Sequence, residues 1–174
     1  SIKARSLTQA KITQHAARIT WSNPPVNALS LAVRKHIYDA VSAALADDRV
    51  DCLVLFGEGG RFSGGADVRE FNTDDATAFP SIIDIGRLLE NADKPSIAAI
   101  EGVALGGGLE LALFCHARVA AGQALLGLPE VKLGVMPGAH GTLRLPRLID
   151  AGKALELMME GRFVSGKEAA ELGL

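Results

Sequence analysis

Apolar residues in the first part of the chain are spaced as in half-buried strands and an amphipathic helix. Residues 1–21 alternate loosely between apolar and polar positions, which predicts one or two strands. After the turn NPPVNAL, Ser30 is a candidate N-cap for a helix whose apolar residues repeat every fourth position. This stripe consists of Val33, Ile37, Val41 and Leu45. The helix is therefore expected to pack against a sheet.

A unit of strand, glycine-rich loop and helix is predicted twice in the middle of the chain. In the first unit, the apolar run 52–56 precedes the loop GEGGRFSGGA and a charged segment beginning at Asp67, interpreted as a helix. A polar stretch at 73–80 breaks the pattern. The isoleucines and leucines of 82–89 then predict a helix that ends near Lys94.

In the second unit, a buried strand at 96–100 precedes the loop EGVALGGG and the segment LELALFCH. Because LELALFCH is apolar on almost every side of a helix, it is expected to lie in the interior. The rest of the chain predicts strands at 118–121 and 124–127 and helices at 142–149, 152–159 and 165–172. With no Pro- and Ser-rich linker, this alternation predicts one α/β domain over residues 1–174.

Composition excludes several classes of function. With 18 basic and 20 acidic residues, the formal net charge is −2, so no strong positive field attracts nucleic acid or an anionic membrane surface. Six Phe, one Trp and one Tyr are too few to form a stacking platform for single-stranded nucleic acid. The longest apolar stretch, 103–115, is interrupted by glycines and Glu110 and is too short to span a bilayer.

The two cysteines predict neither a metal site nor a disulfide. Cys52 and Cys115 stand alone in apolar runs, without the paired spacing of a zinc site, and are typical of small buried hydrophobic residues. This usage favours a reducing compartment. No secretory signal is visible at the start of the chain. We expect a cytoplasmic protein if the source is bacterial, and the sequence does not indicate an organelle otherwise.

Glycines gather in two short stretches that each connect a predicted strand to a predicted helix. Nine of the 19 glycines lie at 57–65 and 102–108. Glycine lets the backbone approach a ligand closely, and the start of a helix exposes amide N–H groups that favour negative charge. Two such loops can direct two amides at one oxyanion. The alternative, two tight turns without a further role, stays open on composition alone.

Two glutamates are the candidate titratable groups. Glu110 is surrounded in its helix by Leu109, Leu111 and other apolar residues, so its carboxyl cannot easily turn to water. Burial of a carboxyl favours its protonated form, whereas a nearby helix start favours the ion, and such competition tunes catalytic acids and bases. Glu130, in GLPEVKLG, is by itself typical of an exposed loop carboxylate.

Three motifs resemble the enoyl-CoA hydratase/isomerase, or crotonase, superfamily in their order and spacing. They are RFSGGADVREF, KPSIAAIEGVALGGGLELALFCHARVA and GLPEVKLGVMPGAHGTLRLPRLI, and the resemblance covers essentially the whole chain. The last motif is especially similar to the hydratase portion of the multifunctional enzymes of fatty-acid β-oxidation. One departure is His140 in PGAHGT, where the family commonly has glycine, and we assign this histidine no role.

The resemblance implies a fold and a set of site residues. The expected fold is a spiral of ββα units, with two nearly perpendicular sheets flanked by helices and acyl-CoA bound between neighbouring turns. Carried over by motif, the site consists of the oxyanion-hole amides of Ala66 and Gly107, the catalytic pair Glu110 and Glu130, and substrate-binding positions at Ala66, Gly107, Asp67 and Val68.

Hydration of a trans-2-enoyl-CoA thioester fits these implied residues. Negative charge develops on the thioester oxygen, where fixed amides stabilise it, and two carboxyls in different protonation states can transfer the protons of one water. An isomerase needs only one carboxylate, so the pair favours a hydratase, with isomerisation as a second activity. The alternative from another class is a catalytically silent acyl-CoA-binding module. No metal or separate cofactor is expected, because coenzyme A is part of the substrate.

The resemblance also implies an assembly. Family members continue into helices that cover the acyl pocket and commonly build trimers. We therefore expect residues 1–174 to form a core domain that lacks its C-terminal helical portion. Apolar helix faces around Met158, Met159 and Leu172 are expected to be covered by association into a homo-oligomer, such as a trimer.

Overall fold

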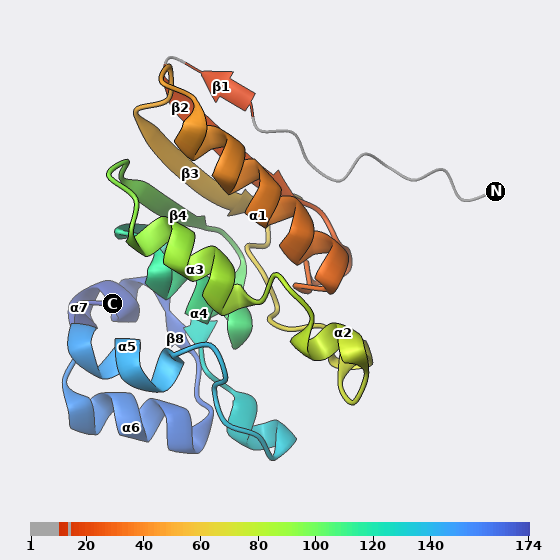
Figure 1. Ribbon diagram of the computed structural model, residues 1–174. Helices are drawn as coiled ribbons and strands as arrows, with labels where there is room; N and C mark the ends of the chain where they lie inside the picture. The colour runs from red at the N-terminus through yellow and green to blue at the C-terminus, as the bar shows by residue number, and fades with distance from the viewer. Residues whose placement is uncertain (1–10, 14) are drawn as a thin grey trace.

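Two β-sheets and the helices around them make up the computed structural model, which describes residues 11–13 and 15–174 (Figure 1). The larger sheet has the strand order β1-β2-β3-β4-β6. Its strands are β1 (Lys11–Thr13), β2 (Ala16–Trp21), β3 (Cys52–Gly57), β4 (Ser96–Ile100) and β6 (Ala117–Ala120). β1 is antiparallel to β2, and the other neighbours are parallel.

The smaller sheet has the order β5-β7-β8. It consists of β5 (Val103–Leu105), β7 (Leu125–Gly127) and β8 (Val164–Ser165). β5 and β7 are parallel, and β8 pairs with β7 in the antiparallel direction. Because β5 follows β4 after only two residues, the chain passes from the larger sheet to the smaller one immediately before the second glycine-rich turn.

Seven α-helices and two short 3₁₀ helices are present in the described part of the chain. They are α1 (Leu31–Ala46), η1 (Val68–Glu70), α2 (Asp74–Thr77), α3 (Ile82–Glu90), α4 (Gly107–Phe114), η2 (Glu130–Leu133), α5 (Gly141–Leu148), α6 (Ala151–Glu160) and α7 (Gly166–Leu172). Figure 1 shows α1 and α3 side by side over the larger sheet, and α2 standing out to one side. None of these helices is both long and apolar enough to cross a membrane.

Caps and apolar periodicities explain the helices that cover the larger sheet, and the cap at Ser30 was predicted from the sequence. The Ser30 side chain caps α1 by accepting a hydrogen bond from the Val33 amide at 3.4 Å, and the apolar stripe of α1 faces the core. At α3, Ser81 and Asp84 form a reciprocal capping box, which satisfies amides that a helix start leaves without partners. Helix α1 confirms the sequence prediction, and α3 begins as predicted but ends at Glu90, before the expected end near Lys94.

Helix α4 lies at the centre of the molecule, as its apolar sequence predicts. All eight of its residues are buried, including Glu110. Leu109 and Leu111 belong to the one hydrophobic core that also contains residues of α1, α3 and both sheets. The position of α4 is therefore fixed by its packing in the core.

Truncation in this core is expected to destabilise the protein strongly. Leu111 is fully buried, so Leu111→Ala is expected to cost about 2–5 kcal/mol in the free energy of unfolding, through lost apolar burial and the cavity left behind. The matched control is Leu155→Ala on α6, where the side chain is 58% exposed and the expected change is within about 0.5 kcal/mol. Urea unfolding of the two variants measures the difference. Equal effects would contradict a central role for α4 in the core.

Three sequence predictions need correction. The loop EGVALGGG contains a strand, β5, because the smaller sheet pairs it with β7, a contact that local pattern does not show. The helix predicted from Asp67 is only the 3₁₀ turn η1, since Asn72 with φ of +64° turns the backbone soon after it. The polar stretch 73–80 contains the four-residue helix α2. The part of the strand prediction that falls on residues 1–10 lies outside the described residues.

The apolar surface predicted near the C-terminal helices is only partly exposed. Met159 is 66% exposed, whereas Met158 and Leu172 pack against the hydrophobic core. The boundaries of the domain and the formation of a homo-oligomer stay predictions.

Candidate active site

One pocket of about 330 Å³ brings together the four residues for which the sequence suggests chemistry. Ala66 follows the first glycine-rich loop, Gly107 and Glu110 lie on α4, and Glu130 begins η2. The chain segments that carry them come from both glycine loops and from the turn after β7. Residues from three separate segments of the sequence thus line one cavity.

The backbone amides of Ala66 and Gly107 lie close together at this pocket. A Cβ atom on Gly107 would lie 3.4 Å from the Ala66 nitrogen, and one on Gly65 would lie 3.5 Å from the Gly107 nitrogen. Gly65 has φ of +108°, a conformation that favours glycine and that turns the chain toward α4. Within the described residues, no protein group accepts a hydrogen bond from either amide. Two unpaired donors at a helix start are suited to a negatively charged oxygen.

The Glu110 carboxyl is oriented in the same pocket by two backbone amides. Its residue is only 2% exposed, and its Oε1 accepts hydrogen bonds from the amides of Ala139 at 2.7 Å and Gly141 at 2.8 Å. Burial raises the pKa of Glu110 above its ordinary value, and the two amide hydrogen bonds partly oppose that rise because they favour the ion. The competition predicted from the sequence is therefore present, but the groups that favour the ion are the loop amides of Ala139 and Gly141 rather than the start of the helix.

Glu130 is less solvated than its sequence context suggests. Its Oε2 atom is buried and has no hydrogen-bond partner among the described residues. Burial raises the pKa of Glu130 to about 7, and the charge of Glu110 adds to the rise. A Cβ on Gly106, where φ is +51°, would lie 3.1 Å from Glu130 Oε1, so glycine at that position leaves space for the carboxyl. The expectation of an exposed loop carboxylate for Glu130 alone is wrong.

The surroundings of the two carboxyls differ in how strongly they stabilise the ionised form. Glu110 has two amide donors on one oxygen, whereas Oε2 of Glu130 is buried and meets no hydrogen-bond partner in the described part of the chain. Such a difference lets one carboxyl accept a proton while the other donates one near neutral pH. Because Glu110 acts on Glu130 through its charge, the two titrations are coupled.

Asp67 and Val68 lie beside this pocket rather than in its wall. Both line a neighbouring pocket of about 320 Å³, which shares Ala66 with the first pocket. The Asp67 carboxylate accepts a hydrogen bond from Arg69 Nη2 at 2.6 Å, and this contact holds its pKa below the ordinary value. Val68 is 58% exposed. The binding role of these two residues stays a prediction.

Sequence reasoning missed much of the pocket wall. The wall also includes Arg34 from α1, Ile82 and Ile83 from α3, and Val135, Met136, Gly138 and Ala139 from the segment before α5. The only sequence signal for Arg34 is its position next to Val33, in the apolar stripe of α1 that faces the core. The loop amides that hold Glu110 give no side-chain signal at all.

His140 connects this loop to the end of α4. It has φ of +71°, which suits the glycine common in the resembling family, and its ring lies 5.8 Å from the Phe114 ring, centroid to centroid. The neighbouring residues 139 and 141 supply the amides that hold Glu110. The side chain of His140, which replaces the glycine common in the family, is therefore half-buried and packs against Phe114.

The other candidate groups do not join the pocket. Burial raises the pKa of the Cys115 thiol to about 12, which keeps it protonated at neutral pH, and both cysteines are free. Among residues 11–13 and 15–174, no group of three His, Cys, Asp or Glu residues could hold a metal ion.

Stability is expected to depend on pH through Glu130. In the folded protein the pKa of Glu130 is about 7, against 4.5 as its ordinary value, so the folded state binds a proton more tightly. The resulting stabilisation is fully present below pH 4.5 and is lost as the pH rises through 7. Thermal unfolding between pH 4.5 and 8 is expected to show a smaller decline in Tm for Glu130→Gln than for the wild type. Parallel profiles would contradict the raised pKa.

Comparisons with known proteins agree on one family. A family model described as enoyl-CoA hydratase/isomerase matches residues 11–174. A peroxisomal bifunctional enzyme of Danio rerio is 53% identical over 163 residues, which cover 94% of this chain and 22% of that protein. A probable enoyl-CoA hydratase of Bacillus subtilis is 45% identical over 168 residues, covering 94% of this chain and 65% of that protein. The chain thus spans about a fifth and about two thirds of these two relatives.

Solved structures show the same fold. The crystal structure of an enoyl-CoA hydratase from Thermoplasma volcanium matches with a TM-score of 0.88 at 34% identity, covering 96% of this chain and 69% of that one. One from Bacillus anthracis matches with a TM-score of 0.85 at 35% identity, covering 97% and 68%. This likeness confirms the fold class that the three motifs predicted.

Proposed function

The chain belongs to the enoyl-CoA hydratase/isomerase family, and from that premise we propose that it adds water across the double bond of a trans-2-enoyl-CoA thioester. The observation that carries this proposal is the single pocket with two unpaired amides and two carboxyls in unlike environments. The names of the relatives support a place in fatty-acid β-oxidation. Coenzyme A is part of the substrate, and no separate cofactor is proposed.

The two amides stabilise charge on the substrate. When water attacks C3 of the enoyl group, the electrons of the double bond move toward the thioester carbonyl, and its oxygen gains negative charge. The N–H groups of Ala66 and Gly107 donate to that oxygen without reorganising, because the backbone already fixes them. The interaction strengthens as charge develops, so it lowers the barrier rather than only binding the substrate.

The carboxyls divide the proton transfers. Glu110, whose ionised form has two amide donors, accepts a proton from the attacking water. Glu130, whose pKa burial raises to about 7, supplies a proton to C2 from its protonated form. Addition of water to C3 and of a proton to C2 gives a 3-hydroxyacyl-CoA, and each carboxyl then has to exchange its proton before the next cycle.

The apolar wall and the neighbouring pocket accommodate the rest of the substrate. Ile82, Ile83 and Met136 offer apolar surface for an acyl chain beyond the reacting carbons. The pocket with Asp67 and Val68 adjoins Ala66, where the thioester carbonyl would bind, and this adjacency supports the proposal that it takes the coenzyme A portion.

Isomerisation of a 3-enoyl-CoA is the second candidate activity. One carboxylate suffices to move a proton between two carbons, so the presence of a second carboxyl in the pocket favours hydration. Assays of trans-2- and trans-3-enoyl-CoA of several chain lengths separate the two activities. We expect the trans-2 substrates to be consumed with the higher kcat/KM. A preference for trans-3 substrates would assign the pocket to an isomerase, and binding without turnover of either would leave a binding module.

A further inference from the structure

A buried arginine on α1 connects several segments around the pocket. Arg34 is only 4% exposed, and its guanidinium donates from Nε to the Pro80 carbonyl at 2.9 Å and from Nη1 to the Leu29 carbonyl at 3.2 Å. Its Nη2 donates to the Asp75 carbonyl, and its Nη1 pairs with Glu70 Oε2 at 3.3 Å. One side chain thus contacts the turn before α1 and three points of the segment 66–80.

The contact with Leu29 leads directly to the Ala66 amide. The Leu29 N–H donates to the Gly65 carbonyl at 2.8 Å, and Leu29 and Ala66 form an isolated parallel bridge. The Gly65 carbonyl and the Ala66 N–H belong to one peptide unit, and in a planar trans peptide they point in opposite directions. A hydrogen bond that fixes the carbonyl on the α1 side therefore aims the Ala66 N–H at the pocket.

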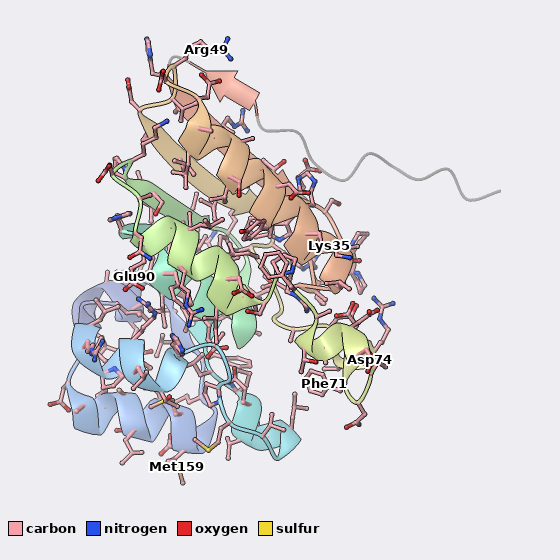
Figure 2. All side chains as sticks on the ribbon, in the orientation of Figure 1. Lys35, Arg49, Phe71, Asp74, Glu90 and Met159 are labelled. Carbon is pink, nitrogen blue, oxygen red and sulfur yellow. The ribbon has the colours of Figure 1, made fainter. Side chains whose placement is uncertain are left out.

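We propose that Arg34 is a positioning residue that aims the Ala66 amide, by fixing Leu29 on one side and the segment 66–80 on the other. This inference rests on the proposed function, because it assumes that the Ala66 amide receives an oxyanion. Figures 1 and 2 show that the segment with α2, where Phe71 and Asp74 are labelled, extends away from the sheets. Its hold on α1 is therefore needed to keep the loop with Ala66 in place.

A guanidinium suits this position better than another cation. The planar fork of Arg34 spreads its donors over three nitrogens that bond separate carbonyls, whereas the ammonium of a lysine has all three donors on one atom. The buried charge is balanced by Glu70, whose carboxylate also accepts a hydrogen bond from the Leu31 amide at 2.8 Å. Loss of Arg34 would leave carbonyls at Leu29 and Pro80 without their buried donors.

The test compares ligands that differ in charge on the thioester oxygen. Acetoacetyl-CoA binds an oxyanion hole as its enolate, whose formation is followed by ultraviolet absorbance, and a saturated acyl-CoA presents a neutral carbonyl. We expect Arg34→Lys and Arg34→Met to weaken enolate binding by about tenfold to a hundredfold, since a misplacement of 1 Å can cost about a hundredfold. Binding of the saturated acyl-CoA should change by less than about threefold, because a neutral carbonyl gains less from the amide. In turnover, kcat should fall while KM changes little.

Controls separate positioning from folding. Arg49→Met removes an exposed arginine that pairs with Asp47 and should leave both ligands unaffected. Circular dichroism and thermal unfolding show whether each variant folds. If Arg34→Met does not fold, Arg34→Lys and Glu70→Gln are used for the test. Glu70→Gln is expected to weaken enolate binding selectively as well, but by a smaller factor.

Two results distinguish this inference from the proposed function. If the wild type binds the enolate but hydrates no enoyl-CoA, and the Arg34 variants still bind the enolate selectively worse, the hydratase proposal fails and the role of Arg34 stands. Folded Arg34 variants with enolate binding like that of the wild type, or with equal losses for both ligands, would overturn the role of Arg34 whether or not the protein is a hydratase.

Discussion

Replacement of Glu110 by glutamine is expected to lower the rate of enoyl-CoA hydration by about a hundredfold to ten-thousandfold, the range contributed by general acid–base groups. Glutamine keeps the shape of the side chain and an oxygen for the amides of Ala139 and Gly141, but it cannot accept the proton of the attacking water. Binding of a saturated acyl-CoA should change much less, because the substrate carbonyl is held by backbone amides. The loss of ultraviolet absorbance of the conjugated thioester measures the rate.

Glu130→Gln is expected to give a loss of similar size, since an amide cannot supply the proton to C2. A matched control is Glu101→Gln, which changes an exposed carboxyl outside the pocket and should leave turnover unchanged. A near-normal rate of hydration by Glu110→Gln or Glu130→Gln would show that the replaced glutamate is not a catalytic acid or base. Equal losses of turnover and acyl-CoA binding would point to a collapsed pocket instead.

Replacement of Ala66 by proline tests the oxyanion hole through the backbone. Proline removes the N–H and keeps the Gly65 carbonyl that Leu29 contacts. Loss of one such donor is expected to reduce transition-state stabilisation by about 2.7–4 kcal/mol, or about a hundredfold to a thousandfold in kcat. Steady-state kinetics of the purified variant measures the effect.

Ala66→Ser is the matched control, because it changes the side chain and keeps the amide hydrogen. It should retain most of the wild-type kcat. A folded Ala66→Pro variant, with circular dichroism and thermal unfolding like those of the wild type, that turns over at the wild-type rate would show that the Ala66 amide does not stabilise the transition state.

Local patterns were sufficient to predict the elements with strong periodicity. The apolar stripe of α1 and the burial of α4 are both determined by residues within one helix. Ser30, a residue type preferred at N-caps, correctly predicts the start of α1. The burial of Glu110 followed from its neighbours in the same helix. In these cases the information lies within a few residues of the element that it describes.

The remaining features depend on partners far along the chain. Strand β5 is only three residues long, and its place in a sheet depends on β7, some 20 residues later. The environment of Glu130 depends on α4 and on the turn at Gly106, and the amides that hold Glu110 come from the loop before α5. Neither arrangement leaves a local pattern. The assignment of Glu130 and of the two amides therefore came from the family motifs, and the pocket is consistent with it.

The most direct test of the proposed function is a reaction of this protein with a trans-2-enoyl-CoA in water enriched in ¹⁸O and deuterium. Addition of water predicts a 3-hydroxyacyl-CoA with one solvent oxygen at C3 and one solvent-derived deuterium at C2, seen by mass spectrometry and nuclear magnetic resonance. The label should be nearly absent in the same period with Glu110→Gln. A product that gains deuterium but no oxygen, or an unchanged substrate bound to folded protein, would contradict the account.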